Sequence, residues 1–178
     1  MELSEFTATL GIIPERTCCF TGHRPSGFYF TDESDCECIR IKENLRREML
    51  SLIDKGVDTF ITGMAAGVDT WAGEICASLK ARGIRLIAAL PCPEQTKGWS
   101  AADKLRYEAL LALCDVSVTI SEKYTPWCMQ QRDRFMVDAS KYVIAVYNGA
   151  DRGGTFYTLS YARKQGKSVA LITSGMIY

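Results

Sequence analysis

The sequence predicts one α/β domain built on a doubly wound, mostly parallel sheet of the Rossmann-like kind. Short apolar runs alternate with amphipathic segments from residue 17 onward. Several of these runs are apolar on both faces, which is typical of parallel strands covered by helices on both sides. A length of 178 residues suits a single domain, because two would each be unusually small. We therefore expect residues 1–178 to form one domain, with residues 1–16 as a loose leader or an addition at its edge.

The predicted strands are short segments that are rich in Val, Ile, Phe or Thr and bounded by Gly, Pro, Asn or Asp. They cover residues 17–21, 57–62, 84–90, 115–120, 142–147 and 168–173. Between them, apolar residues recur at steps of three or four, which is the period of a helix. The predicted helices cover residues 38–52, 68–79, 105–113, 129–139 and 156–162. Gly83 and Gly166 follow the second and the fifth of these helices, where a left-handed residue often ends a helix.

Charge and hydropathy exclude several classes of protein. Lys plus Arg and Asp plus Glu each total 21, so the net charge is zero. Proteins that bind nucleic acid usually carry a basic excess, and we therefore expect no nucleic-acid partner. No stretch approaches 18 consecutive apolar residues, and the first residues lack the basic-then-apolar plan of a signal peptide. We expect a cytoplasmic protein with no membrane partner.

The cysteines suggest packing rather than metal binding. All eight lack the C-x-x-C spacing, and the single histidine, His23, has no second ligand at a zinc-type spacing. We therefore predict that the thiols are reduced, act as small apolar side chains and hold no metal. Nor does any other pattern indicate a cofactor.

Glycine-rich turns follow two of the predicted strands and lead into helices. In a doubly wound sheet, ligands bind at the carboxyl ends of the strands, near the point where strand order reverses. Glycine lets backbone N–H groups approach an anion, and the helix N-terminus adds a favourable dipole. These turns, with the basic residue that follows the first strand, predict a phosphate site. Its predicted ligand-binding residues are Gly22, His23, Arg24, Gly63, Met64, Ala65, Gly67, Asp69, Arg132, Gly153, Gly154 and Thr155.

Arg132 stands out because it lies on an apolar face of its predicted helix, between Met129 and Met136. A guanidinium in such a place must be paired with a carboxylate or directed at an anion. Two interpretations follow. Arg132 is a structural partner of Asp133, Asp138 or Glu94, or it binds the phosphate of a ligand.

Other polar and aromatic residues near the turns also allow two interpretations each. His23 is either a hydrogen-bonding residue of the fold or a ligand-binding group. Asp69 lies in the first turn of a predicted helix, where it caps the helix or binds ribose hydroxyls. Trp99 and Tyr107 form a stacking platform for a base or anchor a loop.

The residues of these turns resemble the YpsA-like family of the SLOG superfamily, named for the DNA-processing protein DprA/Smf and the LOG phosphoribohydrolases. The similarity covers about residues 17–172 and is carried by GHRP at 22–25, TGMAAGVDTWA at 62–72, PCPEQTKGW at 91–99 and the segment 132–162. It implies a Rossmann-like fold with a pocket for a nucleotide or a nucleotide-derived ligand. Related SLOG proteins are often dimers, so the resemblance also allows a homodimer.

The comparison with LOG enzymes bears on catalysis. In these enzymes an M-x-x-R-K stretch and a later P-G-G-x-G-T-x-x-E stretch supply an arginine and a glutamate associated with cleavage of the N-glycosidic bond. Met129 and Arg132 match the first stretch, but Asp133 replaces the lysine and Thr158 stands in place of the glutamate. A threonine hydroxyl cannot act as a carboxylate base.

Three functions therefore stay open. We expect first a module that binds or senses a nucleotide or an ADP-ribose-like ligand and reports it to a protein partner. The alternatives are an N-glycosidic hydrolase and a DprA-like protein associated with single-stranded DNA. The candidate catalytic residues of the hydrolase are Arg132, Asp69 and Glu94.

Overall fold

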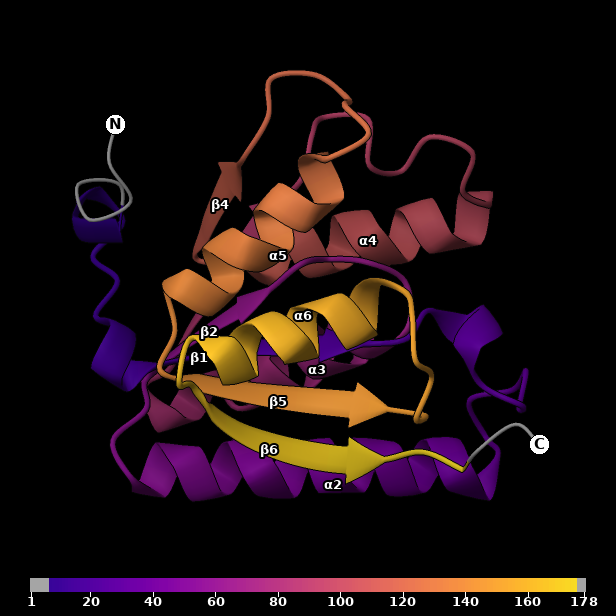
Figure 1. Cartoon of the computed structure of the whole chain (residues 1–178), viewed down its shortest axis with the longest axis horizontal. Helices are drawn as coiled ribbons and strands as arrows, with labels where there is room; N and C mark the ends of the chain where they lie inside the picture. Colours follow the sequence, from indigo (N-terminus) through magenta and orange to yellow (C-terminus); the bar gives the residue numbers. More distant parts are fainter. Residues whose placement is uncertain (1–6, 176–178) are drawn as a thin grey trace.

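A computed structural model describes residues 7–175, and its centre is a sheet of six parallel strands (Figure 1). The order across the sheet is β4-β3-β2-β1-β5-β6, and every neighbouring pair is parallel. The Rossmann-like α/β prediction is thereby confirmed. The strands are β1 (Thr17–Gly22), β2 (Thr59–Thr62), β3 (Arg85–Leu90), β4 (Val116–Thr119), β5 (Tyr142–Tyr147) and β6 (Ser168–Thr173).

Helices cover both faces of the sheet (Figure 1). One face is packed by α2, α3 and α4, and the other by α5 and α6. Because parallel strands need a crossover connection, each pair of consecutive strands is linked through at least one helical segment. The helices are α2 (Cys36–Asp54), α3 (Val68–Ser78), α4 (Ala101–Leu113), α5 (Cys128–Asp138) and α6 (Gly154–Lys164).

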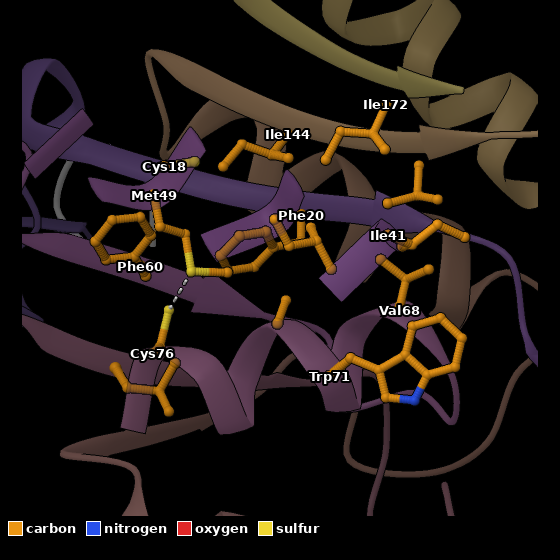
Figure 2. Close-up of a cluster of buried hydrophobic side chains, with 14 of the residues drawn as sticks. Cys18, Phe20, Ile41, Met49, Phe60, Val68, Trp71, Cys76, Ile144 and Ile172 are labelled. Atoms are coloured by element: carbon orange, nitrogen blue, oxygen red, sulfur yellow. Dashed lines mark hydrogen bonds between the residues drawn. The ribbon is translucent and has the colours of Figure 1, made fainter. Parts of the chain in front are cut away.

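Two apolar cores result from the alternation of side chains along the central strands. In β1, Cys18 and Phe20 point into the first core, and Cys19 points into the second. Figure 2 shows the first core, where the rings of Phe20 and Phe60 stack with centroids 6.0 Å apart. The Cys76 thiol lies 3.7 Å from the sulfur of Met49 in the same core. Burial raises the pKa of the Cys76 thiol, so it acts as an apolar packing group.

The helix ends differ in how their backbone groups are satisfied. Asp35 caps α2 by accepting a hydrogen bond from the Glu37 amide, and Ser100 caps α4 in the same way through Asp103. Gly83 and Gly166 adopt the left-handed conformation expected of them, with φ of 79° and 67°. By contrast, α5 and α6 begin without a side-chain cap. The first N–H groups of α6 are therefore open to other partners, whereas Cys128 at the start of α5 donates its N–H to the Thr125 carbonyl.

The reversal of strand order lies between β1 and β5. From β1 the chain adds β2, β3 and β4 on one side, and it then returns across the sheet to place β5 on the other side of β1. The connections leaving β1 and β5 therefore diverge, and a crevice opens above their carboxyl ends.

The start of β2 differs from the start predicted from its apolar residues. The sequence predicts a strand from residue 57, but Val57 donates its N–H to the Leu52 carbonyl and so closes the end of α2. Strand β2 starts two residues later, at Thr59.

Part of the expected leader packs against the domain. Ile12 is buried in the second core, and Arg85 donates hydrogen bonds to the carbonyls of Leu10 and Gly11. The remainder of that segment, residues 1–6, lies outside the described residues. Within residues 7–175, no helix is both long enough and apolar enough to cross a membrane.

Candidate functional site

A cleft of about 340 Å³ opens at the switch point between β1 and β5. Its walls come from the end of β1, the turn before α3, the first turns of α5 and the start of α6. Segments distant in sequence thus meet where a doubly wound fold places its ligand. The lining residues are Phe20, Thr21, Gly22, His23, Arg24, Ala65, Asp69, Met129, Arg132, Asp133, Gly154 and Thr155.

The start of α6 presents free backbone donors to this cleft. Gly153, with φ of 101°, lies at the N-cap and has no side chain to cap the helix. Gly154 is exposed, and a Cβ built on it would meet no atom within 4 Å. Thr155 adds a hydroxyl beside these amides. Such a helix end attracts anions through its N–H groups and its dipole.

Arg24 supplies the positive charge at the mouth of the cleft. Its side chain is exposed, and within the described part of the chain it forms no ion pair. Its charge also lowers the pKa of Asp69, which lines the same cleft, against the larger effect of burial. A free arginine beside an open helix N-terminus is well placed to bind a phosphate.

His23 joins the two strands that flank the switch point. Its Nε2 accepts a hydrogen bond of 3.2 Å from the amide of Asn148, the first residue after β5. Its ring stacks on Tyr147, with centroids 5.9 Å apart. Burial lowers the pKa of His23, which keeps the imidazole neutral and able to accept this bond. His23 therefore fixes the geometry of the cleft as well as lining it.

The turn between β2 and α3 serves close packing more than anion binding. Gly67, with φ of 93°, lies so near β1 that a Cβ would come within 2.6 Å of the His23 carbonyl oxygen. Val68 donates its N–H to that same carbonyl. Met64 is buried and has a positive φ of 58°, a strained conformation for a side chain of this size. The amides of this turn thus face protein groups, in contrast to those at the start of α6.

Arg132 is buried at the back of the cleft and is held by several groups. Its Nε donates to Asp133 at 2.7 Å, and its Nη1 donates to the Gly63 carbonyl. The same Nη1 lies 3.9 Å from Asp69 Oδ2. Of the structural partners considered from sequence, the structure selects Asp133. The Nη2 group makes no hydrogen bond to any residue in the range 7–175.

Two carboxylates flank this guanidinium. Burial raises the pKa of Asp69 to about 6, although Arg132 opposes the shift. Asp133 accepts hydrogen bonds from Arg132 Nε and, at 3.2 Å, from the hydroxyl of Thr158. A carboxylate from α5 is therefore in contact with the Thr158 hydroxyl on α6.

Two further cavities adjoin the cleft. One of about 530 Å³ is bounded by Glu94, Trp99 and Tyr124, and it shares Arg24 and Met129 with the cleft. The other, of about 440 Å³, lies between α5 and α6 and shares Met129, Asp133 and Gly154 with it. Met129 thus lies where all three meet.

The structure gathers most, but not all, of the residues predicted to bind ligand. Gly63, Met64, Gly67 and Gly153 lie in the turns behind the cleft and do not line it. Glu94 lines the second cavity. Sequence reasoning did not assign Asp133 to the lining of the cleft. The i, i+4 spacing of Met129 and Asp133, which puts both on one face of α5, could have indicated that Asp133 lines the cleft.

Fold and cleft together define a Rossmann-like α/β protein with a polar crevice at its switch point. The chain matches the model of the YspA SLOG family, YpsA, over residues 18–175. It belongs to that family.

Similarity to individual proteins is consistent with this family. The chain is 24% identical over 154 residues to the UPF0398 protein YpsA of Bacillus subtilis (strain 168), covering 84% of this chain and 86% of that protein. It is 28% identical over 153 residues to a UPF0398 protein of Bacillus thuringiensis (strain Al Hakam), covering 83% and 82% of the two chains.

Among solved structures, the fold is similar to the X-ray structure of DNA processing protein A (DprA) from Streptococcus pneumoniae. The TM-score is 0.62 at 17% sequence identity, and the match covers 92% of this chain. This chain spans about half of that structure, 52% of its length. At this identity the similarity establishes a shared fold.

Proposed function

We propose that the cleft binds the phosphate of a nucleotide or of a nucleotide-derived ligand such as an ADP-ribose-like molecule. The observation that carries the proposal is the meeting of an uncapped α6 N-terminus with the unpaired Arg24. The N–H groups near Gly154 and the hydroxyl of Thr155 bind the phosphate oxygens, while Arg24 neutralises their charge. A volume of about 340 Å³ accommodates a small ligand.

The proposal assigns different roles to the two arginines. Arg24 is exposed and forms no ion pair with any residue from 7 to 175, so it contributes directly to the affinity for phosphate. Arg132 holds Gly63 and Asp133 in place, and only its Nη2 is left for an anion. Loss of Arg132 therefore affects folding as well as binding.

Titration calorimetry with a panel of nucleoside monophosphates and diphosphates tests the proposal. A charge-assisted hydrogen bond contributes about 1.5–3 kcal/mol, so Arg24→Ala should weaken binding roughly ten- to a hundredfold at unchanged stability. Gly154→Val should weaken it similarly, because its side chain would project into the cleft where no protein atom lies. Arg47→Ala is the matched control, because Arg47 is an exposed arginine on α2 without an ion pair in the described chain.

Two outcomes would contradict the proposal. One is the absence of binding by every phosphate ester in the panel. The other is an equal effect of Arg24→Ala and Arg47→Ala on affinity, which would mean that only the overall charge of the protein matters.

A second candidate function is hydrolysis of the N-glycosidic bond of the bound nucleotide. It is favoured by the two carboxylates beside Arg132, of which Asp69 holds its proton to a higher pH than an ordinary aspartate. A carboxyl group that keeps its proton to higher pH can serve as the acid in cleavage of a glycosidic bond. Asp133 would supply the carboxylate that the LOG pattern has at the position of Thr158. The Thr158 hydroxyl donates a hydrogen bond to Asp133, so this carboxylate lies close to that position.

Chromatography of nucleotide incubated with the protein tests this second function. Hydrolysis would release the free base and ribose 5-phosphate in equal amounts, with one water consumed. Asp133→Asn should abolish release while leaving phosphate binding within about threefold, because the amide keeps one oxygen for hydrogen bonding. If the unchanged protein releases no base from any nucleotide that it binds, the binding function stands alone.

A further inference from the structure

The connection between β3 and α4 forms a second compartment beside the phosphate cleft. Residues 91–100 bend through successive turns, in which Lys97 donates to the Glu94 carbonyl and Trp99 donates to the Thr96 carbonyl. The resulting cavity of about 530 Å³ joins the cleft at Arg24 and Met129. A ligand anchored at α6 can therefore extend into it without leaving the protein surface.

Gln95 lines this compartment and carries a buried hydrogen-bond acceptor that has no partner among the described residues. Its side chain is only 6% exposed, and its Nε2 donates to the Gly63 carbonyl at 2.9 Å. That bond fixes the orientation of the amide, because only the NH₂ group can face a carbonyl oxygen. The other atom, Oε1, is buried and has no hydrogen-bond partner among the described residues. A buried acceptor without a donor is unfavourable in the unliganded protein.

Aromatic side chains complete the compartment. Trp99 is partly buried, and its ring is held at 85° to that of Tyr107, with centroids 5.7 Å apart. Tyr107 itself packs against the first core, so the indole rests on a fixed support. Tyr124 is 62% exposed and also lines the cavity. Flat aromatic faces of this kind stack with nucleobases.

The acceptors in this compartment indicate what sort of base it takes. Gln95, Glu94 and Lys97 line the cavity, and the exposed carboxylate of Glu94 forms no ion pair within residues 7–175. The Glu94 carboxylate and Gln95 Oε1 accept hydrogen bonds, and an amino group on a base donates them.

From these contacts we infer that the compartment at residues 91–100 receives the base of the bound nucleotide and selects an amino-bearing purine. The base stacks on Trp99 beside Tyr124, and its amino group donates to the exposed Glu94 carboxylate or, once the buried amide of Gln95 turns toward the cavity, to its Oε1. This inference rests on the proposed phosphate site, because the shared residues Arg24 and Met129 set the path from phosphate to base.

Matched nucleotides test the inference. AMP is compared with purine riboside 5′-monophosphate, and GMP with IMP, so that each pair differs only by one amino group. In at least one pair the amino-bearing member should bind about three- to tenfold more tightly, which corresponds to one hydrogen bond. Ribose 5-phosphate, which has no base, should bind at least tenfold more weakly than that nucleotide, about the contribution of one stacked base.

Substitutions in the compartment test which side chains contribute to binding of the base. Trp99→Leu keeps an apolar side chain but removes the stacking face, and it should reduce the advantage of the nucleotide over ribose 5-phosphate about tenfold. Tyr124→Ala should reduce it less, because Tyr124 is largely exposed. Tyr29→Ala is the control, since Tyr29 is 55% exposed and lines none of the three cavities around Met129.

The failures of the two proposals are distinguishable. Equal binding of ribose 5-phosphate and all nucleotides would overturn the base compartment and leave the phosphate site intact. Equal binding within both matched pairs would overturn the preference for an amino group. The absence of binding by ribose 5-phosphate and by every nucleotide would overturn both proposals.

Discussion

At Gly67, the turn that follows β2 and the turn that follows β1 meet backbone to backbone. The φ of 93° disfavours any side chain, and a Cβ would lie 2.6 Å from the His23 carbonyl oxygen, which cannot swing away as a side chain would. Gly154 differs from Gly67 in both respects, since its φ is not positive and its surroundings are open.

This contrast predicts unequal costs for the same substitution. Gly67→Ala should lower the free energy of unfolding by about 1–3 kcal/mol or more, the cost of a strained backbone conformation. Gly154→Ala should change it by less than about 0.5 kcal/mol, as exposed substitutions usually do. Urea denaturation of the two variants measures both values. Equal stabilities would show that the contact at Gly67 relaxes without cost.

Residue patterns predicted where the candidate residues gather better than they predicted what each residue contacts. Alternation and glycine turns placed His23, Arg24, Asp69 and Gly154 at one edge of the sheet, because strand ends of a parallel sheet coincide. The sequence could not distinguish packing glycines such as Gly67 from an open one such as Gly154. That difference depends on which backbone lies opposite, a contact between segments distant in the chain.

At the scale of elements, the long connection from β1 to α2 is held by a polar cluster centred on Glu33. Arg106 on α4 donates to Glu33 at 2.6 Å and to Glu74 on α3 at 2.7 Å. The Trp71 indole donates to Glu33 at 2.8 Å, and Lys42 pairs with it from α2. Three helices are thereby joined to a loop that lies next to the cleft.

The cluster predicts a loss of stability in acid. Although burial opposes it, the hydrogen bonds from Arg106, Lys42 and Trp71 lower the pKa of Glu33 from 4.5 to about 2. A lowered carboxylate pKa contributes stability above pH 4.5, and this contribution is lost as the pH falls toward 2. Glu33→Gln should therefore be less stable than the unchanged protein at pH 6, and the difference should shrink as the pH falls below about 4. Thermal unfolding across this range measures it. A difference independent of pH would assign the loss to packing.

Sequence patterns predicted the six strands and the helices α2 to α6, but their ends less well. Strand β5 begins and ends as predicted because Lys141 and Asn148 bound it with polar residues. Helix α4 starts earlier than its apolar pattern, at Ala101, because the Ser100 cap decides the start. The Glu33 cluster gave no sequence signal, since its members are separated by up to 73 residues.

At the scale of the whole molecule, Asp69 should shape the dependence of stability on pH. Its pKa is raised from 3.8 to about 6, so the folded protein holds this proton more tightly than the unfolded chain does. The resulting stabilisation is complete below pH 3.8 and is lost as the pH rises through about 6.

Asp69→Asn removes this dependence. The stability of the variant relative to the unchanged protein should rise between pH 4 and pH 7, because asparagine has no charge to bury. Urea midpoints at several pH values test this, with Glu33 titrating at lower pH. A constant difference between the two proteins across this range would mean that Asp69 is ionised throughout.

The reversal of strand order also divides the sheet into two parts, which share both apolar cores. Residues 17–119 build β1 to β4, residues 128–173 build α5 to β6, and the sheet joins them along one ladder, β1 with β5. The connecting segment carries exposed Tyr124 and Trp127, where a protease could cut the chain. A ligand bound between Arg24 of one part and Gly154 of the other would contact both fragments of the cleaved protein. The association of the two fragments would then be stronger with ligand bound than without it. This difference makes the fold a suitable starting point for a split biosensor.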